Sequence, residues 1–291
     1  MIQKITTRAA VGPIAAQLVK GRQYGHIHSI FHNCFNIMIG DQLIYFGNKS
    51  HFDIPFGVML DDAAYSLLSE SVKVGEVVVF HPGKIMFYGS TRIKQLTFLE
   101  LKERSLSIPK IDLTVLELYQ AYAQLEDWMR KGHVEKKTGL SFSLPLEFNR
   151  YFSEDQRRLW QLIDTYVNKE NSAEGAVYFL GRGIGLTPSG DDLVTGLMVV
   201  LQAFGEDVEL PDGYQTTAVS NAYLHAAGQG FATSILIEVV HSLQGKNLLK
   251  KCGELVSFGH SSGYDTLFGL LAALQIVIHK KEGGLTHGIN R

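Results

Sequence analysis

The stretch Gly181–Gly196, GRGIGLTPSGDDLVTG, combines three alternating glycines, a Thr-Pro-Ser-Gly segment and two adjacent acids. An apolar run at helical spacing, Leu193–Phe204, overlaps its end, so the stretch predicts a loop that enters the N-terminus of a helix. Glycines permit positive φ angles and a close approach of a ligand to backbone amides. The first turn of a helix also leaves N–H donors free for an anion. This stretch is therefore the leading candidate for a binding site.

The two acids, Asp191 and Asp192, would repel a bare phosphate unless a divalent cation bridged them. Magnesium binds in this way to one or two carboxylates and phosphate oxygens, so the pair is a candidate magnesium site. A purely structural interpretation makes Ser189 an N-cap with Asp192 three residues later, where acids stabilise the first turn by about 0.3 to 1 kcal/mol each. It accounts for the serine and one acid but leaves the alternating glycines unexplained, which favours a functional site.

The pattern Ser-Gly-x-Asp-x-x-x-Gly-Leu occurs twice, at residues 189–197 and 262–270. Each copy opens an apolar helix with an aspartate in its first turn, and each places a glycine one turn later, where a second backbone can approach closely. We therefore expect the two helix starts to converge, so that Asp192 and Asp265 face one cavity. The competing interpretation is a chance match of two short helix-start signals.

Composition indicates a globular protein. With 291 residues, 45% of them hydrophobic and 19% charged, the chain can bury one large core or two, and its net charge of −2 gives no footprint for nucleic acid. The two cysteines, Cys34 and Cys252, permit at most one disulfide, which fits a reducing compartment. Residues 1–23 lack the apolar core of a signal peptide, and the apolar windows are too short to span a bilayer. We expect a soluble, cytoplasmic protein without a membrane or nucleic-acid partner.

The hydrophobic pattern of residues 24–101 has a period near two. Alternate residues of Ile27–Ile39 fall on one face of a single predicted strand, and Gly40-Asp41 turns the chain into a second strand. Another hairpin is predicted at residues 74–88, around Pro82-Gly83. These elements predict a β-rich N-terminal domain, either a small barrel or a sandwich-like sheet.

Four side chains that can bind metals, His26, His28, His32 and Cys34, fall on the opposite face of that predicted strand. Zinc on such a strand is physically reasonable. The outermost two would lie roughly 26 Å apart at about 3.3 Å per residue, so only two or three could share an ion. We favour a polar sheet face, with a metal-dependent hydrolase built on these histidines as a weaker alternative.

Composition shifts at residues 100–110, where a charged segment is followed by Pro109. This shift predicts a boundary between a β-rich domain at 1–108 and a helical domain at 109–291, an α+β fold in which the second domain carries the glycine-rich loop. Helical periodicity then predicts helices at 111–130, 153–168, 216–243 with a break near 228–230, 248–258 and 265–280, with a long connecting loop at 131–149. The second of these helices starts with a capping box, Ser153-Glu154-Asp155-Gln156.

Polar residues recur every fourth position at Thr217, Asn221, His225 and Gln229. The stripe lines a cavity or faces solvent, and the sequence leaves these two interpretations equal. His260 is the only histidine beside either helix start, and its titration range makes it a candidate for proton transfer or anion contact. A structural histidine is the competing interpretation.

Three segments resemble the blocks shared by one bacterial family: LGRGIGLTPSGDDLVTGLM at 180–198, TTAVSNAYLHAAGQG at 216–230 and FGHSSGYDTLFG at 258–269. The family is catalogued as a domain of unknown function and loosely called carboxylases. It includes the AllH-type subunit of oxamate carbamoyltransferase, an enzyme of anaerobic allantoin breakdown. The resemblance covers long strings in matching order, whereas the N-terminal region is similar to the family only in character.

The resemblance implies one subunit of a multi-subunit transferase that moves a carbamoyl group between oxalurate and phosphate, giving oxamate and carbamoyl phosphate. Both substrates are small anions, so we assign roles from the chemistry of the residues. The candidates for proton transfer or cation binding are Asp191, Asp192, His260 and Asp265. The candidates for anion or substrate binding are Arg182, Gly183, Gly185, Thr187, Ser189, Gly190, Asn221, Gln229, Ser261, Ser262 and Gly263.

An alternative of another class is a non-catalytic subunit that binds a metabolite or serves as a scaffold for its partners. Binding and catalysis use the same anion-holding groups, so the sequence does not separate these two functions. The expected partners are small anionic metabolites, the other subunits of the complex and further copies of the chain.

Overall fold

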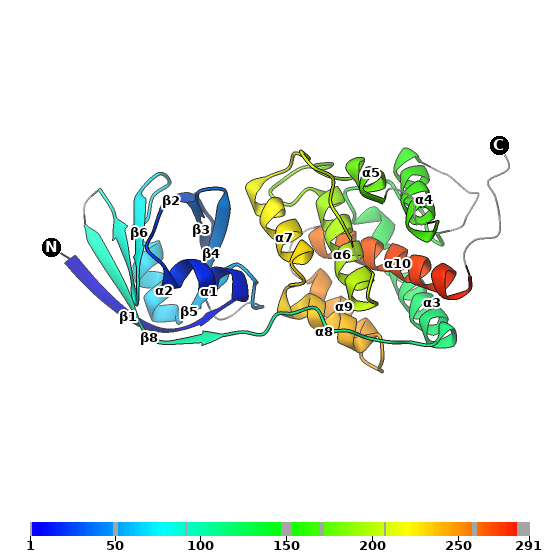
Figure 1. Ribbon diagram of the computed structural model, residues 1–291, viewed down its shortest axis with the longest axis horizontal. Helices are drawn as coiled ribbons and strands as arrows, with labels where there is room; N and C mark the ends of the chain where they lie inside the picture. Colours follow the sequence, from blue (N-terminus) through cyan, green and yellow to red (C-terminus); the bar gives the residue numbers. More distant parts are fainter. Residues whose placement is uncertain are drawn as a thin grey trace. The chain divides into compact units, whose positions relative to one another are not determined.

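The computed structural model describes residues 2–48, 52–90, 92–146, 153–168, 172–206, 208–257 and 261–283. The chain divides into two compact units. The first comprises residues 1–107 with Ala232–Ser234, and the second comprises residues 108–231 and 235–291. The first is a closed β-barrel and the second is helical, which confirms the predicted α+β fold (Figure 1).

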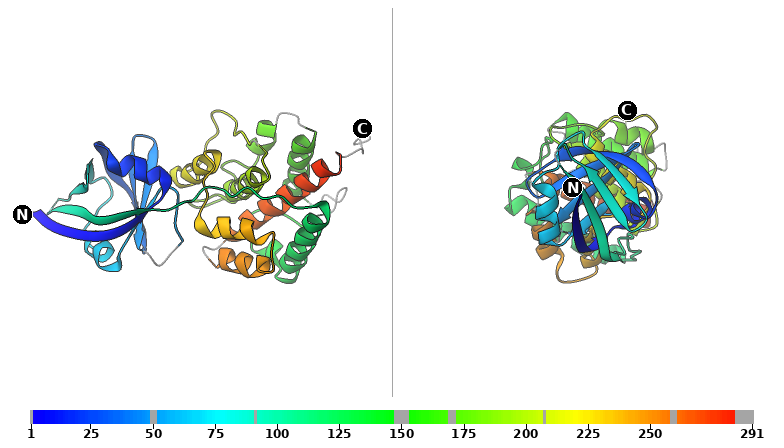
Figure 2. Two further views of the ribbon diagram at one scale, coloured as in Figure 1. Left: turned by 60° about the horizontal axis from the view of Figure 1, so that its bottom comes forward. Right: turned by 90° about the vertical axis from the view of Figure 1, so that its left-hand side faces the viewer.

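Eight strands close the barrel in the order β1-β5-β4-β3-β2-β6-β7-β8. Neighbours pair antiparallel except for β1 with β8 and β4 with β5, which are parallel. The long β1 and β8 lie side by side in both views of Figure 2. The strands are β1 (Ile2–Val11), β2 (Gln23–Ile30), β3 (Cys34–Ile39), β4 (Gln42–Asn48), β5 (Gly57–Leu60), β6 (Val77–His81), β7 (Lys84–Tyr88) and β8 (Ile93–Glu103), with helices α1 (Pro13–Lys20) and α2 (Asp62–Ser69) between them.

Aromatic rings fill part of the barrel core. Phe35 and Phe46 stack with centroids 5.3 Å apart, and Phe87 meets both edge-on at 6.2 and 6.3 Å. Both predicted hairpins are confirmed, since β3 pairs with β4 and β6 pairs with β7. Gly40 and Gly83 take positive φ angles of 59° and 78° at the two turns, as tight hairpin connections require.

The single strand predicted through Ile27–Ile39 is wrong. The chain reverses after β2, with Phe31 N–H donating to the Cys34 carbonyl at 2.8 Å, and β2 and β3 form an antiparallel hairpin in which His26 lies opposite Met38. The alternating pattern continued through the turn, so periodicity alone did not reveal the reversal. His26, His28 and His32 therefore do not share one extended strand, and within the described ranges no three His, Cys, Asp or Glu side chains are placed to hold a metal ion.

The helical unit is built around α10 (Ser262–Lys281), which contacts α3, α4, α6 and α9. Helices α6 and α10 have the most extensively buried surfaces of this unit, because their apolar runs continue around the helix. The other helices are α3 (Val115–Lys131), the short 3-10 helix η1 (Val134–Lys136), α4 (Glu154–Val167), α5 (Ser172–Val177), α6 (Ser189–Ala203), α7 (Ala218–Gly228), α8 (Ser234–Ser242) and α9 (Leu248–Val256).

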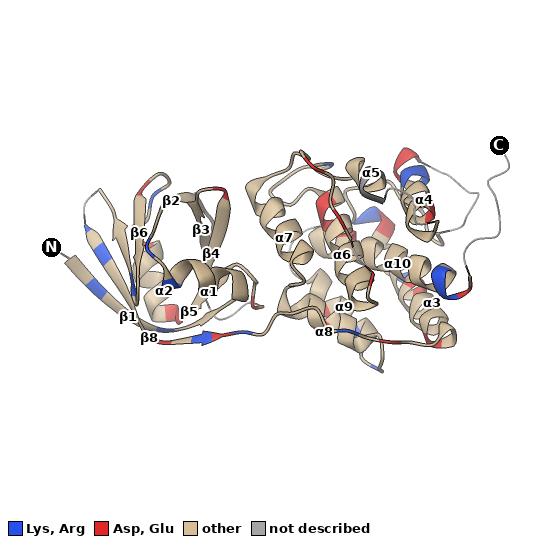
Figure 3. Ribbon diagram, in the orientation of Figure 1, with Lys and Arg blue, Asp and Glu red and all other residues tan. Residues whose placement is uncertain are grey.

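Charged residues of both signs are interspersed, and the beginning of α4 carries adjacent acidic and basic bands (Figure 3). The predicted capping position at Ser153 is confirmed, since its hydroxyl accepts from Gln156 N–H at 3.0 Å. The predicted break near residues 228–230 is also confirmed, because α7 and α8 are separate helices. In the part of the chain that is described, no helix has the length and apolar character needed to cross a bilayer.

Candidate functional site

The two copies of the repeated motif pack against each other at the starts of α6 and α10. A Cβ on Gly196 would overlap the carbonyl oxygen of Thr266, and a Cβ on Gly269 would overlap that of Leu193. Thr266 and Leu193 each follow the motif aspartate directly, so the two contacts are equivalent by an approximate two-fold relation. The prediction that these glycines allow close backbone approach is confirmed.

The motif aspartates and serines interact across this crossing. Burial raises the pKa of Asp192 well above its usual value, the Ser262 hydroxyl favours the charged form, and the charge of Asp265 raises the pKa further. Burial also raises the pKa of Asp265 to about 6, against the opposing hydrogen bonds of Thr138, Ser189, Gly139 N–H and Ser261. The serine of each motif copy thus hydrogen-bonds the aspartate of the other copy. The two predicted helix starts therefore lie together.

One carboxylate oxygen of each aspartate is buried without a hydrogen-bond partner. These atoms are Oδ2 of Asp192 and Oδ2 of Asp265, and neither meets a donor among the described residues. Asp192 retains 8% of its exposure and Asp265 none. Unpartnered buried polar atoms are rare in folded proteins, and two such oxygens in one small region mark it as a candidate for binding or proton transfer.

Asp191 has a different environment from its neighbour. Its Oδ1 accepts from Gly181 N–H at 2.7 Å, and its Oδ2 accepts from the Thr216 hydroxyl. The carboxylate therefore fastens the glycine-rich loop to the segment before α7. Because both oxygens have protein donors, the geometry does not favour the predicted magnesium bridge between Asp191 and Asp192.

The glycine-rich loop adopts the predicted conformation. Gly181, Gly183 and Gly185 take φ angles of 74°, 123° and 91°, which side chains other than glycine rarely adopt. Residues 183–186 are exposed, and Ile184 reaches 94%. Within the described residues, no acceptor meets the backbone N–H groups of residues 183–187. The loop thus presents a run of free donors beside a helix N-terminus, an arrangement suited to anions.

Ser189 is not the N-cap of α6. That position is taken by Pro188, and Ser189 lies inside the first turn at 3% exposure. Proline fixes its own φ and supplies no side-chain cap, so the helix begins one residue earlier than the capping pattern predicts. The serine hydroxyl is free to act on Asp265 instead.

A strap at Thr138–Ser141, in the connection predicted as a long loop, covers Asp265. Thr138 Oγ1 donates to Asp265 Oδ1, and Gly139 N–H donates to the same oxygen at 3.2 Å. A Cβ on Gly139 would overlap Ser189 Oγ. This strap was not predicted from the sequence, where the local signal is a Thr-Gly pair within an otherwise irregular segment.

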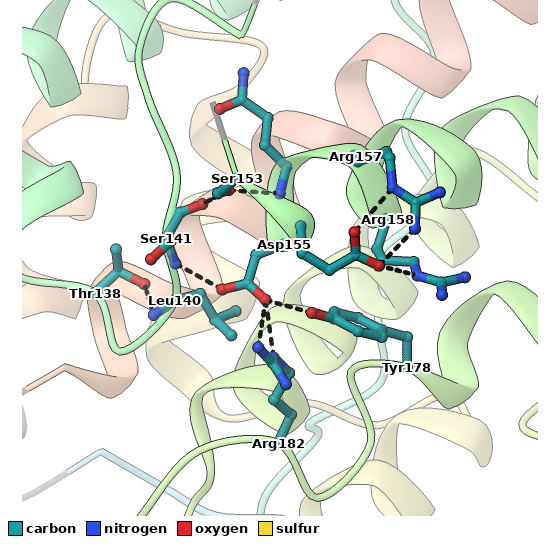
Figure 4. Close-up of polar contacts among 11 residues, drawn as sticks. Thr138, Leu140, Ser141, Ser153, Asp155, Arg157, Arg158, Tyr178 and Arg182 are labelled. Atoms are coloured by element: carbon teal, nitrogen blue, oxygen red, sulfur yellow. Dashed lines mark hydrogen bonds and ion pairs between the residues drawn. The ribbon is translucent and has the colours of Figure 1, made fainter. Parts of the chain in front are cut away.

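Arg182, predicted to bind an anion, is held by Asp155 at the start of α4. Its Nε and Nη2 each lie 2.8 Å from Asp155 Oδ1, and Tyr178 Oη donates to the same oxygen at 2.7 Å. Figure 4 shows these groups around the carboxylate. In the sequence Asp155 is part of the capping box at residues 153–156, and nothing there predicts its contact with Arg182.

The polar stripe on α7 lies partly in a cavity. His225 and Gln229 line a space of about 800 Å³ together with residues 208–214, and Gln229 Nε2 lies 2.7 Å from His225 Nε2. Asn221 is exposed and accepts from Tyr214 Oη at 2.8 Å. Thr217 is the N-cap of α7, and its hydroxyl donates to the Leu186 carbonyl of the glycine-rich loop. The structure therefore combines both interpretations of the stripe.

Of the remaining predicted residues, Thr187 lowers the pKa of Asp192 by hydrogen bonding, and Ser261 is the N-cap residue of α10. Gly190 and Gly263 are equivalent positions of the motif, each packed on backbone, at Phe179 and Leu255 respectively. His260 lies outside the described residues, so its predicted role stays a prediction.

Two family models match the chain. The model described as oxamate carbamoyltransferase subunit AllH matches residues 179–274, which include both copies of the motif. The model described as the AllH family N-terminal domain matches residues 6–98, within the barrel. No solved structure matches the chain.

Proposed function

The chain belongs to the AllH family of oxamate carbamoyltransferase subunits, and we propose that the paired starts of α6 and α10 form the site where a carbamoyl group passes between oxalurate and phosphate. Such a subunit works with the other subunits of its enzyme. We place the reaction in anaerobic allantoin catabolism in the cytoplasm, a compartment that fits the two free cysteines.

The observation that carries this proposal is the reciprocal contact between the motif aspartates and serines, with an unpartnered oxygen on each carboxyl group. Two carboxyls in one buried region do not readily ionise together. At neutral pH the pair would therefore carry one proton. We assign it to Asp192, because burial and the charge of Asp265 raise its pKa, whereas the Thr138 hydroxyl and Gly139 N–H donate to Asp265 and favour its ionised form.

A carboxyl pair with one proton matches the proton balance of the transfer. When a phosphate oxygen attacks the carbamoyl carbon of oxalurate, the C–N bond breaks and the leaving oxamate nitrogen needs a proton, which Asp192 would donate. The attacking phosphate hydroxyl loses a proton, which returns to the pair. One C–O bond replaces one C–N bond, and the pair ends in its initial protonation state.

The glycine-rich loop would hold the negative charge of the substrates. Its N–H groups at residues 183–187 have no acceptor among the described residues, and Arg182 in the same loop supplies a fixed positive charge. Preorganised donors of this kind stabilise developing negative charge without reorganisation during the reaction.

The test is carbamoyl transfer by the assembled complex containing Asp192→Asn or Asp265→Asn. We expect Asp192→Asn to lower kcat by about 100-fold or more, the usual contribution of a general acid, because an amide cannot donate the proton of a carboxylic acid. Asp112→Asn is the matched control, since this carboxylate is exposed and, among the described residues, forms its ion pair with Lys281. Full activity in both motif variants would eliminate the catalytic assignment.

The complete burial of Asp265 favours a second candidate function. In that case the subunit binds the anionic metabolite through its loop, and a partner subunit performs the chemistry. Under this alternative Asp192→Asn changes the KM of the complex and leaves kcat intact, so the same kinetic experiment separates the two candidates.

A further inference from the structure

Asp155 joins three segments of the helical unit at one buried carboxylate (Figure 4). Its Oδ1 accepts from Arg182 and Tyr178, and its Oδ2 accepts from Ser141 N–H at 2.8 Å. The side chain of Asp155 is 7% exposed, whereas that of Arg182 is 44% exposed. One end of the ion pair is thus fixed in the protein interior, and the other end reaches solvent.

The Arg182 guanidinium is constrained in two directions. Asp155 Oδ1 bonds Nε and Nη2, and the Tyr178 ring lies 4.6 Å from the guanidinium carbon. No described residue bonds to Nη1. A planar guanidinium held along one edge and one face presents its remaining edge, with two N–H donors in fixed geometry, to an oxyanion.

A second arginine lies on the aromatic ring that holds Arg182. Arg158 lies over the Tyr178 ring at 5.2 Å and also pairs with the carboxylate of Glu154. Two guanidinium groups therefore lie over one ring. A site lined by guanidinium groups favours a carboxylate or phosphate over a neutral ligand.

Two segments connect Asp155 and Arg182 to the carboxyl pair. The strap donates from Gly139 N–H to Asp265 and from Ser141 N–H to Asp155, and two residues span at most about 7 Å. The backbone of Arg182 is joined to the start of α6, since its carbonyl accepts from Gly190 N–H at 2.8 Å.

We propose that Arg182 is the receptor for an oxyanion group of the substrate, and that Asp155 is the positioning residue that aims it. The oxyanion is either the carboxylate of the organic substrate or the phosphate. The proposal rests on the proposed function for the identity of these substrates. The binding itself follows from the fixed guanidinium and does not require that this chain performs the chemistry.

The experiment is a calorimetric titration of the full chain with inorganic phosphate and, separately, with oxamate, followed by kinetics of the assembled complex. We expect Arg182→Lys and Asp155→Asn each to weaken the binding of one anion about tenfold. The same variants raise KM for that anion by a larger factor than they lower kcat. The anion affected identifies the oxyanion that Arg182 binds.

Asp127→Asn is the matched control. This residue also holds an arginine, since Asp127 Oδ1 lies 2.9 Å from Arg130 Nη2, but the pair is on α3 and outside the cluster. It should leave both affinities unchanged. If Asp155→Asn does not fold, Asp155→Glu is used in its place, because it keeps the negative charge and displaces the Arg182 guanidinium. We expect it to weaken anion binding by the same factor.

Unchanged affinities for both anions in Arg182→Lys, or in the folded Asp155 variant, would overturn the proposal, as would a wild-type chain that binds neither anion. If the complex transfers no carbamoyl group but the chain binds an oxyanion in a manner that depends on Asp155, the proposed function fails and this proposal stands. If carbamoyl transfer by the complex is the same with the Arg182 and Asp155 variants as with wild type, this proposal fails and the proposed function stands.

Discussion

The starts of α6 and α10 share one sequence motif and differ in what surrounds their aspartates. Asp192 is 8% exposed and has the hydroxyls of Ser262 and Thr187 nearby. Asp265 has no exposure, and its Oδ1 accepts two donors from the strap at Thr138–Ser141. The first start adjoins an exposed glycine-rich loop, whereas the second is covered.

This difference separates what the motif provides from what its surroundings provide. The motif gives two helices that cross at glycine contacts with a carboxyl group on each side. The flanking segments then make the two carboxyls unequal, so that Asp192 keeps some exposure and Asp265 is covered and raises the pKa of Asp192 by its charge. Asymmetric environments of this kind are how proteins assign different protonation states to two carboxyl groups.

The glycine crossing is the feature most sensitive to substitution. Gly269→Ala would place a methyl group on the Leu193 carbonyl, so we expect it to lower the free energy of unfolding by about 3 to 4 kcal/mol, with Gly196→Ala somewhat below that. Urea unfolding measures both. Gly253→Ala on α9 is the control, because nothing lies within 4 Å of the added atom, and it should be neutral or gain up to about 1 kcal/mol. If the Gly269→Ala protein is as stable as wild type, the close contact between Gly269 and the Leu193 carbonyl is wrong.

The covered aspartate should produce a pH dependence of stability. The pKa of Asp265 is about 6 when folded, against 3.8 ordinarily, so the folded state binds this proton more tightly than the unfolded state. Stability from this group is therefore greatest below pH 4, falls as pH rises to about 6, and is lower by about 3 kcal/mol above that. Asp265→Asn should make the decline measured by urea unfolding between pH 4 and 8 smaller by about 3 kcal/mol, while the decline caused by Asp192, whose pKa is also raised, remains. If the free energy of unfolding of the variant falls with pH as much as that of wild type, groups other than Asp265 cause the decline.

Asp191 distinguishes the first copy of the motif, since the equivalent position in the second copy is Tyr264. Asp191→Ala leaves Gly181 N–H and the Thr216 hydroxyl without their acceptor, and we expect a loss of about 2 kcal/mol. Asp191→Asn retains one acceptor oxygen and should lose about half as much. Thermal unfolding measures both variants, and equal losses would show that the two bonds do not contribute separately.

Within the loop, the smallest effect is expected at Gly185. Its φ angle is 91° but nothing lies within 4 Å of an added Cβ, so Gly185→Ala should cost about 1 kcal/mol from backbone strain alone. Gly183→Ala should cost more, because its Cβ would also lie 2.6 Å from Ser189 N. Thermal unfolding of both variants tests this order, and the reverse order would contradict the loop geometry.

Several features were predictable because they depend on neighbouring residues. The turns at Gly40 and Gly83, the positive φ angles of the glycine-rich loop and the capping position at Ser153 follow from local backbone chemistry. The convergence of the two helix starts followed from an internal repeat, which is a non-local signal carried by the sequence itself.

Other features were not predictable, because they depend on segments that meet only on folding. Periodicity did not show the reversal between β2 and β3, since alternation is unchanged when a strand turns back. The strap over Asp265 and the Asp155 contact with Arg182 join residues 126 and 27 positions apart, and nothing near Gly139 or Asp155 in the sequence indicates these partners.

The sequence by itself determined the α+β division of the fold, the two motif helices and the motif aspartate near the start of each, because spacing and residue type act over a few bonds. Only the tertiary structure decided how the two aspartates differ and which residues hold the arginine. Burial and charge proximity set these properties, and both arise when distant parts of the chain pack together.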